Sequence, residues 1–283
     1  MLLDGKSAIV TGSSKGLGRG YAIALAKNGA RVVVNSRNAS DVDLVVQEIT
    51  SMGGKAVACV ENVSTWEGAQ RIIQCAKDNF KRLDILVNNA GITRDRTLFN
   101  MSEEDWDEVI AIHLKGSFAC GKFAAMEMQK QQGGRIINIT SGSGLRGNFG
   151  QTNYAAAKAG IIAMTMTWAK ELAKHQITVN AIRATAMTKM TEPLLARAVK
   201  HANEAGMPIP KPEELGIYPP EAAAPLVVFL ASDEAALING RVIGIDGPQL
   251  VLWATPQESR TAYMYPGWTV ETLMKHYKGA LGI

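Results

Sequence analysis

Residues Ser7–Gly18 read SAIVTGSSKGLG, a short apolar run followed at once by a glycine-rich turn. The run Ser7–Val10 is typical of a short buried strand. A helical pattern through Tyr21 and Leu25 comes next and stops at Asn28-Gly29, residue types that commonly end a helix. The stretch therefore predicts a strand, a tight turn and a helix in immediate succession.

The same alternation continues along the first 140 residues. Further strands are predicted at residues 31–35, 56–60, 84–88 and 136–139. Helix starts are predicted by the N-capping pairs Ser40/Asp43, Ser64/Glu67 and Ser102/Asp105, the last opening a long helix to about Gln131. Regular alternation of this kind predicts an α/β fold with a parallel sheet and helices on both faces.

Composition excludes several classes of protein. The 283 residues are 47% hydrophobic and 20% charged, which is ordinary for a soluble globular protein. A net charge of +4 with no basic block gives no support for nucleic-acid binding. The sequence contains no run of about 18 apolar residues, so we predict no membrane span. Asp4 and Lys6 interrupt the apolar N-terminus, so we predict no signal peptide. We therefore expect a cytoplasmic protein.

The three cysteines are odd in number and widely spaced, at Cys59, Cys75 and Cys120. This pattern favours reduced, buried thiols over disulfides, and we expect no metal site.

The glycine turn follows a strand and opens a helix, which is the setting that a phosphate-binding turn requires. Gly12, Gly16 and Gly18 let the backbone approach a pyrophosphate closely, and the helix N-terminus supplies free N–H groups. These features favour a bound dinucleotide. The alternative is a tight strand–helix junction without a ligand.

A second stretch, Ser141–Lys158, reads SGSGLRGNFGQTNYAAAK. If residues 155–169 form a helix, Tyr154 and Lys158 lie on one face of it, because they are four residues apart. A phenol titrates near pH ~10, and a neighbouring cation lowers that pKa, which makes Tyr154 a candidate general acid or base. Ser141 can hydrogen-bond a carbonyl or alcohol oxygen. The alternative is an ordinary pair on a solvated helix.

Four motifs follow one another along the sequence: Thr11-Gly12-x-x-x-Gly16-x-Gly18, Asn88-Asn89-Ala90-Gly91, Ser141, and Tyr154-x-x-x-Lys158. In this order and spacing the chain resembles the short-chain dehydrogenase/reductase family over roughly residues 4–247. The resemblance implies a doubly wound, Rossmann-type sheet of seven parallel strands in a single domain (1–283). It also implies a nicotinamide cofactor at the carboxyl ends of the strands and a homo-oligomer, a tetramer or a dimer.

The resemblance also implies residue roles. Tyr154 exchanges the proton, Lys158 binds the nicotinamide ribose and lowers the tyrosine pKa, and Ser141 orients the substrate oxygen. Asn88 braces its strand. The predicted cofactor site consists of Gly12, Ser14, Lys15, Gly16, Leu17, Gly18, Ser36, Arg37, Asn62, Val63, Asn89, Ala90, Gly91, Tyr154, Lys158 and Thr188.

Cofactor choice depends on the end of the second strand, which reads Asn35-Ser36-Arg37 and carries no carboxylate. A carboxylate there would bind the ribose of NAD and repel a 2′-phosphate. Arg37 can instead pair with that phosphate, and Lys15 adds a second cation, so we expect NADP in preference to NAD. Each cation alone can equally be a solvated surface residue. Asn62 is expected to accept a hydrogen bond from the adenine through its carboxamide oxygen.

Two positions depart from the family pattern. His113 occupies the place of an asparagine that holds a relay water, so it is either an altered relay residue or a core-facing histidine. The usual Pro-Gly after the sixth strand is replaced by Arg183-Ala184-Thr185, which leaves the local backbone path open. Thr188 still resembles the threonine that contacts the nicotinamide carboxamide.

The segments around residues 91–96, 104–107, 113–118 and 147–151 resemble the (3R)-hydroxyacyl-CoA dehydrogenase domain of the multifunctional β-oxidation enzyme. This likeness implies a 3-hydroxyacyl/3-oxoacyl thioester as the small-molecule substrate. Alicyclic or steroid alcohols are the alternative substrates. A non-catalytic dinucleotide-sensing protein is the alternative from another class.

Two segments follow the motifs. Residues 186–220, with Met187 and Met207, are expected to form a substrate lid, or else to pack as a surface helix. Residues 248–283 extend beyond the usual end of the family. They carry Tyr263, Tyr265 and Trp268, and Thr269 is predicted to cap a final helix. This extension can cover either a neighbouring subunit or the pocket.

Overall fold

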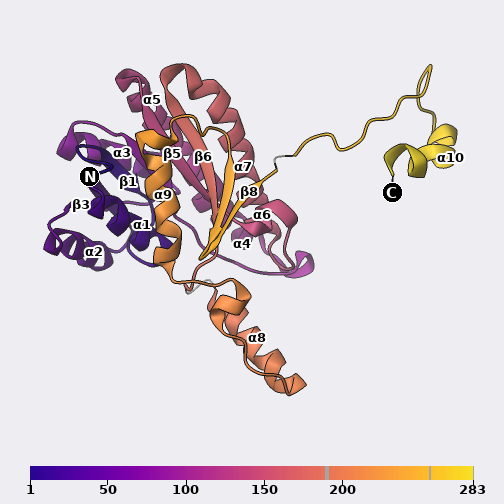
Figure 1. Ribbon diagram of the computed structural model, residues 1–283, viewed down its shortest axis with the longest axis horizontal. Helices are drawn as coiled ribbons and strands as arrows, with labels where there is room; N and C mark the ends of the chain where they lie inside the picture. The colour runs from indigo at the N-terminus through magenta and orange to yellow at the C-terminus, as the bar shows by residue number, and fades with distance from the viewer. Residues whose placement is uncertain (189–190, 255, 283) are drawn as a thin grey trace. The chain divides into compact units, whose positions relative to one another are not determined.

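The computed structural model describes residues 1–188, 191–254 and 256–282 (Figure 1). The chain forms two compact units, Met1–Trp253 and Ala254–Ile283. All residues predicted to take part in the site belong to the first unit.

One sheet runs through the first unit. Its strands are β1 (Ser7–Val10), β2 (Arg31–Ser36), β3 (Lys55–Val60), β4 (Ile85–Asn88), β5 (Gly134–Thr140), β6 (Ile177–Ala184), β7 (Val242–Asp246) and β8 (Gln249–Trp253). Their order is β3-β2-β1-β4-β5-β6-β7-β8, and β1 to β7 are parallel. The strand order reverses between β1 and β4, which is where doubly wound sheets bind ligands, at the carboxyl ends of their strands. The predicted doubly wound α/β fold is confirmed.

The predicted count of seven strands is short by one. Within the predicted extension, β8 pairs antiparallel with β7, from Val242 opposite Trp253 to Asp246 opposite Gln249. Gly247 has a φ of +54°, a conformation that suits glycine, and allows the tight turn between them. The run QLVLW is apolar and short enough to be a strand, but no pattern in it reveals its partner.

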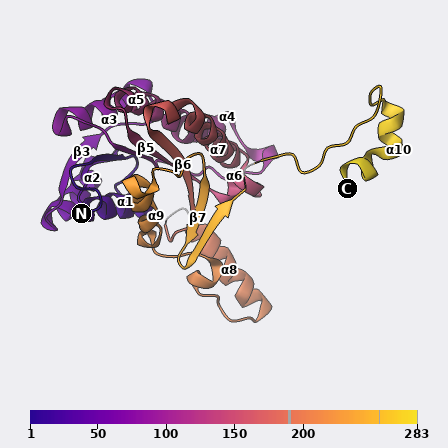
Figure 2. The ribbon, with the colours of Figure 1, turned by 45° about the horizontal axis from the view of Figure 1, so that its top comes forward.

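Nine helices surround the sheet in the described part of this unit, besides short 3₁₀ turns. They are α1 (Gly16–Lys27), α2 (Ala39–Ser51), α3 (Trp66–Phe80), α4 (Glu103–Ile110), α5 (Gly116–Gln131), α6 (Gly142–Arg146), α7 (Thr152–Leu172), α8 (Glu192–Ala205) and α9 (Ala224–Ala231). Helices α1, α2 and α9 cover one face of the sheet, and α3, α5 and α7 cover the other (Figure 2).

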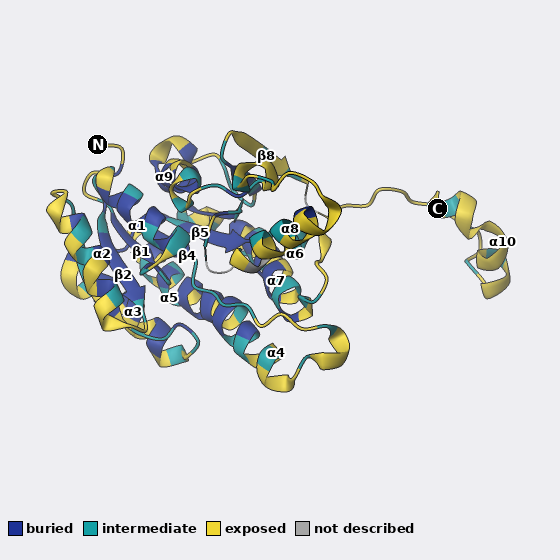
Figure 3. Cartoon of the chain, turned by 90° about the horizontal axis from the view of Figure 1, so that it is seen from below, coloured by how far each residue is buried: buried dark blue, intermediate teal, exposed yellow. Residues whose placement is uncertain are grey.

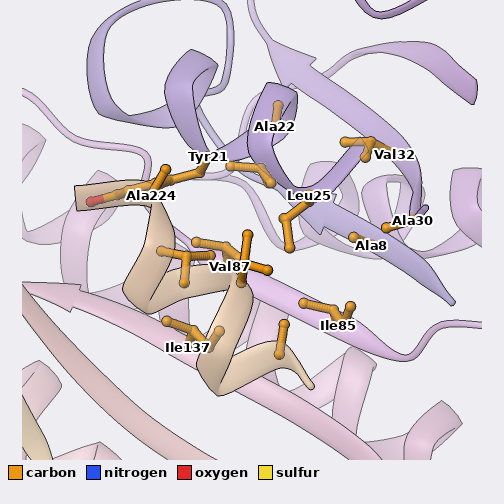
Figure 4. Packing of buried hydrophobic residues seen from close by; sticks show 14 of the residues in the cluster. Ala8, Tyr21, Ala22, Leu25, Ala30, Val32, Ile85, Val87, Ile137 and Ala224 are labelled. Atoms are coloured by element: carbon orange, nitrogen blue, oxygen red, sulfur yellow. The ribbon is translucent and has the colours of Figure 1, made fainter. Parts of the chain in front are cut away.

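The core lies on both faces of the sheet. Every residue of β1 and β4 is buried, as expected of parallel strands between two helical layers (Figure 3). Figure 4 shows one of these layers, in which Tyr21 and Leu25 of α1 and Ala224 of α9 pack over Val87 and Ile137. Each fully buried aliphatic side chain of this kind stabilises the fold by about 1.5–3 kcal/mol. This packing holds the carboxyl ends of the strands at one edge.

Helix starts were predicted with mixed success. Ser102 caps α4 as predicted, and its hydroxyl accepts a hydrogen bond from a backbone N–H 3.1 Å away. The cap of α2 is Asn38 and not Ser40, and the cap of α3 is Thr65 and not Ser64. In both wrong cases the predicted serine donates its hydroxyl to a nearby asparagine side chain instead.

The long helix after Ser102 is continuous from Glu103 to Gln131, as predicted, but its middle turn Ala111–Lys115 is π-helical. Its length and apolarity would suffice to cross a membrane, yet half of the apolar window is buried inside the protein. It is therefore a core helix of the α/β unit. Single π turns are frequent at functional sites, and this one carries His113.

The predicted lid segment leaves the sheet after β6. A bridge between Ala186 and Tyr218 closes its base, with Met187 N–H donating to the Tyr218 carbonyl at 2.8 Å. The Tyr218 ring lies where a side chain on Gly247 would be, which fixes this base to the end of β7. Residues 189 and 190 of the lid lie outside the described residues.

The second unit contains one helix, α10 (Val270–Leu281). Thr269 caps it as predicted, since its Oγ1 accepts from the Thr272 N–H at 3.1 Å. Val270 and Met274 are each 76% exposed on this helix, so it presents apolar side chains to its surroundings.

Candidate functional site

The glycine turn between β1 and α1 fits a pyrophosphate. Gly12 and Gly16 have φ values of +63° and +54°, and a Cβ on Gly12 would lie 2.7 Å from Ala90 Cα. The N-cap residue of α1, Lys15, makes no side-chain hydrogen bond to the first turn. The first N–H groups of the helix, including those of Leu17 and Gly18, thus remain available to an anion. Ser14, also predicted, lies half-buried in the same turn.

The segment after β4 holds this turn in place. The Asn89 side chain donates to the carbonyls of Thr11 and Gly12 at 2.9 and 3.1 Å. Thr11 Oγ1 in return accepts from the backbone N–H groups of Asn89 and Ala90 at 3.0 and 3.1 Å. Asn89 therefore shapes the turn with its side chain, and Thr11, which begins the glycine motif but was given no predicted role, is a positioning residue.

Asn35 is a second positioning residue that was missed. Its buried carboxamide donates to the carbonyls of Cys59 and Glu61 at 3.0 and 3.1 Å. Its oxygen also accepts from the Gly12 N–H at 3.4 Å. One polar residue in the otherwise β-branched run RVVVNS is the sequence signal that could have indicated it.

The two predicted phosphate-binding cations differ in their surroundings. Arg37, just after β2, is exposed and forms no ion pair within the part of the chain that the structure describes. Lys15 is paired with Asp41 of α2 at 2.6 Å. Ser36 Oγ accepts from the Asn38 N–H at 3.2 Å and is half-buried. Arg37 is consequently the freer of the two cations at the end of β2.

The expectation for Asn62 is wrong in its detail. Its carboxamide oxygen accepts from the backbone N–H and the hydroxyl of Ser64, at 3.1 and 3.0 Å. That oxygen is thus already used to shape the turn before α3, and the amide NH₂ is the group left for another partner. The neighbouring Val63 is buried against Gly116 at the start of α5.

Asn88 braces its strand as expected. Its side chain donates to Asn138 Oδ1 at 2.9 Å, and Asn138 in turn donates to Thr165 Oγ1 at 2.9 Å. These bonds join β4, β5 and α7 through buried polar groups. This series of buried hydrogen bonds therefore fixes α7 relative to the ends of the strands.

Helix α7 brings Tyr154 and Lys158 together on one face. Lys158 is 3% exposed, its Nζ lies 5.5 Å from the centroid of the Tyr154 ring, and it donates to the Ile139 carbonyl at 2.7 Å. Ser141 caps α6 and accepts from the Ser143 N–H at 3.2 Å. A hydrogen bond from Ser141 favours the phenolate of Tyr154 and opposes a rise in its pKa. The three residues therefore form one cluster.

We predicted that Lys158 lowers the pKa of Tyr154, but in this structure the pKa of Tyr154 is raised. Burial raises the pKa of Tyr154 and outweighs the Ser141 hydrogen bond, while the nearby carboxylate of Asp95 raises it further. The Lys158 Nζ lies 5.5 Å from the centroid of the ring and donates to the Ile139 carbonyl. Burial also lowers the pKa of Lys158 to about 7.

His113 lies against this cluster. Its Nε2 is 2.9 Å from the Ile92 nitrogen and 2.7 Å from the Ile92 oxygen. Gly91 leaves room for it, since a Cβ there would overlap the imidazole. Burial, helped by the charge of Lys158, lowers the pKa of His113 to about 3. The imidazole is therefore neutral near pH 7 and contacts both the segment after β4 and the Tyr154 ring.

The segment after β6 also reaches the site. A Cβ on Gly16 would lie 3.1 Å from the methyl group of Thr188, so this threonine stands over the glycine turn. Arg183 pairs with Asp246, and Asp246 Oδ1 accepts from the Thr185 N–H at 2.9 Å. These contacts define the backbone path where the family's Pro-Gly is missing.

The four motifs thus meet at the carboxyl ends of β1, β4 and β5, whereas the predicted residues Ser36, Arg37, Asn62 and Val63 lie at or after the ends of β2 and β3. Residues 6–198 match the sequence pattern of the short chain dehydrogenases. The chain belongs to the short-chain dehydrogenase family. It is accordingly an oxidoreductase with a site for a nicotinamide dinucleotide.

Several members of the family are similar over most of the chain. The 3-oxoacyl-[acyl-carrier-protein] reductase FabG of Thermotoga maritima is 43% identical over 249 residues, covering 87% of this chain and 98% of the relative. The hydroxyacyl-CoA dehydrogenase ChsB1 of Mycobacterium tuberculosis is 42% identical over 271 residues, covering 91% and 82%. The chain also matches 30% of the longer peroxisomal multifunctional enzyme type 2 of Mus musculus, with 42% identity over 240 residues.

The fold of the short-chain dehydrogenase is shared with a solved structure. The crystal structure of a short chain dehydrogenase from Mycobacterium avium superposes with a TM-score of 0.86 at 38% sequence identity. The match covers 100% of this chain and 96% of that protein.

Proposed function

We propose that this short-chain dehydrogenase interconverts a 3-hydroxyacyl thioester and a 3-oxoacyl thioester with NADP(H). The observation that carries the proposal is the cluster of Ser141, Tyr154 and Lys158 beside the glycine turn. It provides a hydroxyl, a phenol and an amine at the carboxyl ends of the strands.

A nicotinamide dinucleotide held at the glycine turn by residues such as Gly12 and Gly16 would supply the hydride chemistry of the proposed reaction. The chain's own residues handle the oxygen and its proton. Ser141 donates a hydrogen bond to the substrate oxygen, and Tyr154 gives its phenolic proton to that oxygen during reduction. Because burial raises the pKa of Tyr154, the phenol is protonated near pH 7 and ready to act as the acid. This protonation state suits the proton transfer that reduction requires.

Lys158 and His113 support this step without exchanging the substrate proton. Lys158 Nζ, held beside the tyrosine ring by the Ile139 carbonyl, would bind a ribose hydroxyl of the dinucleotide. Neutral His113 holds the Ile92 backbone and one face of the site. Its position in the π turn supports a role in the proton relay.

NADP in preference to NAD is supported by the end of β2. No carboxylate stands at residues 35–38, and the exposed Arg37 would pair with a 2′-phosphate through its planar donor fork. The carboxylate of Asp41, nearby on α2, is neutralised by Lys15. A ribose 2′-phosphate would therefore meet positive charge here.

The acyl thioester is supported by the names of the relatives, a 3-oxoacyl-[acyl-carrier-protein] reductase and a hydroxyacyl-CoA dehydrogenase. It is also supported by the lid, where Met187 and Met207 are 43% and 49% exposed. Adaptable methionines suit an apolar acyl chain.

The deciding experiment measures NADPH oxidation with acetoacetyl-CoA, a set of cyclic ketones and a set of steroid ketones. We expect the highest kcat/KM with the thioester. Faster turnover of a cyclic or steroid ketone would overturn the substrate class. Binding of NADPH without turnover of any ketone would instead favour a dinucleotide-sensing protein.

We further propose that the protein works in the cytoplasm as a homo-oligomer, a tetramer or a dimer. An apolar groove between α4, α5 and α7 supports self-association, and Phe118 in it is 41% exposed. The groove is lined by Ile110, Leu114, Lys115, Phe118, Gly160 and Met164. Light scattering on the purified protein tests this, and a monomer at micromolar concentration would contradict it.

A further inference from the structure

A chain of hydrogen bonds connects Ser141 to a carboxylate outside the predicted site. Gln151 Nε2 donates to Asp95 Oδ2 at 2.9 Å, and Ser143 Oγ donates to Gln151 Oε1 at 2.7 Å. The Ser143 N–H then donates to Ser141 Oγ at 3.2 Å. Asp95 follows β4, whereas the other three residues lie between β5 and the first turn of α7. This series of hydrogen bonds therefore joins the segment after β4 to the segment between β5 and α7. In the proposed function both segments flank the substrate oxygen.

The backbone keeps these two segments in register. The Arg96 N–H donates to the Gly150 carbonyl at 2.8 Å, and Arg96 forms an isolated bridge with Gln151. The side chain of buried Asn153 donates to the carbonyls of Arg94 and Asp105 at 3.0 and 2.9 Å. Asp95 and Gln151 are thus held next to each other independently of their own hydrogen bond.

The carboxylate of Asp95 fixes which group donates and which accepts in each of these hydrogen bonds. An ionised carboxylate only accepts hydrogen bonds, so Gln151 must turn its NH₂ group toward Asp95 and its oxygen toward Ser143. Asn148 Nδ2 donates to the same oxygen at 2.9 Å, which agrees with this orientation. Ser143 must then use its hydroxyl hydrogen on Gln151.

The direction carries through to Ser141. Since the hydroxyl hydrogen of Ser143 is used on Gln151, Ser143 Oγ can only accept from Ser141. The Ser143 N–H donates to Ser141 Oγ at 3.2 Å, and the Ser141 hydroxyl donates to Ser143 Oγ over a long 3.5 Å, a weak bond that a substrate oxygen can replace. Ser141 therefore keeps its own hydrogen to donate. Its natural target is the oxygen shared by Tyr154 and the substrate.

We propose that Asp95 is a positioning residue that acts through Gln151 and Ser143 to fix the direction in which Ser141 donates its hydroxyl hydrogen. This inference rests on the proposed function of Ser141 and Tyr154. It extends the site to three residues that the motifs do not include.

Within the described residues, Lys158, His113 and Asp95 bear or can bear charge and act on Tyr154. Lys158 approaches from α7 with its Nζ 5.5 Å from the ring centroid, and the neutral imidazole of His113 approaches from the π turn at 5.1 Å between centroids. Asp95 approaches from the segment after β4, and its negative charge raises the pKa of Tyr154. Removing that charge lowers the pKa of Tyr154, so alcohol oxidation, which needs the phenolate, should begin at a lower pH.

The test compares Asp95→Asn with Asp107→Asn, a matched change of an exposed carboxylate on α4. Asparagine can donate as well as accept, so Gln151 is free to turn over in the first variant. We expect kcat for ketone reduction to fall about three- to tenfold, the effect of one misdirected hydrogen bond, with KM and NADPH affinity unchanged. The rising limb of the oxidation pH profile should move to lower pH. The Asp107→Asn variant should match the wild type.

Ser143→Ala supplies a second arm, because it breaks the chain without removing a charge. We expect it to lower kcat by a similar factor and to leave the pH profile in place. Wild-type kcat in both Asp95→Asn and Ser143→Ala, or a fall in kcat without any movement of the Asp95→Asn pH profile, would overturn the inference.

A spectroscopic readout separates this inference from the proposed function. If the wild type reduces no ketone, the proposed function fails, and NMR of ¹³Cζ-labelled tyrosine still reports the titration of Tyr154, assigned by loss of its signal in Tyr154→Phe. A lower titration midpoint in Asp95→Asn supports the placement of the carboxylate. An unchanged midpoint overturns it.

Discussion

The imidazole of His113 meets the phenol ring of Tyr154 edge to face, with their centroids 5.1 Å apart and their planes at 90°. The contact joins the π turn of the long helix to the first turn of α7. Because His113 also contacts the Ile92 backbone, it links the segment that clamps the glycine turn to the proposed acid. The residue that departs from the family pattern is therefore in direct contact with the reacting group.

The role of His113 can be tested by comparing His113→Ala with His113→Asn. Alanine leaves the half-buried Ile92 backbone without its side-chain partner, so we expect the free energy of unfolding to fall by about 1–3 kcal/mol. Asparagine keeps a donor and an acceptor, and it should recover most of the stability and of kcat. Urea unfolding and steady-state kinetics measure both. Equal stability of the alanine variant and the wild type would contradict the structural role.

Arg37→Asp should move cofactor preference toward NAD. Loss of one charge-assisted pair and gain of a repulsive carboxylate should reduce the ratio of kcat/KM for NADPH over NADH by about 10- to 100-fold. Lys15→Gln is the matched control and should change this ratio less, because Lys15 is already paired with Asp41. An unchanged ratio in Arg37→Asp would remove the assignment of NADP.

Burial of Lys158 predicts a pH dependence of stability. Its pKa is lowered to about 7 in the folded protein, from 10.5 as the ordinary value. Between these values the unfolded chain binds the extra proton, so this group's contribution to stability rises with pH up to about 10.5 and is most unfavourable below about pH 7. The Lys158→Met variant has no amine at this position and therefore lacks this pH-dependent contribution to stability. In urea unfolding, the free energy of unfolding of the variant should rise relative to that of the wild type as the pH falls from 9 to 6. A constant difference between the two free energies across this pH range would contradict the prediction.

The fold was predictable because its signals are local. Strand–helix alternation, the turn after Val10 and the four-residue spacing of Tyr154 and Lys158 are all properties of short stretches. The sheet, the long helix to Gln131 and the cap at Ser102 followed from them.

The parts that were missed depend on contacts between distant segments. The clamp of Thr11 on Asn89 and Ala90 spans more than 75 residues, and nothing local marks it. The Asn62 oxygen was wrongly expected to face the adenine because its bond to Ser64 competes for it. The position of the Lys158 amine over the ring depends on the Ile139 carbonyl of another element. The pairing of β8 with β7 is local by contrast, because it crosses the tight turn at Gly247, and it was missed because residues 248–283 were read only as an extension.

The central claim is that Tyr154 gives the proton to the substrate oxygen beside the bound dinucleotide. The most direct test measures NADPH oxidation with acetoacetyl-CoA by the wild type and by Tyr154→Phe, with NADPH affinity measured in parallel. We predict that the phenylalanine variant binds NADPH as the wild type does and loses about 10²–10⁴-fold in kcat, the range of general acid catalysis. Near-normal turnover in that variant would contradict the account.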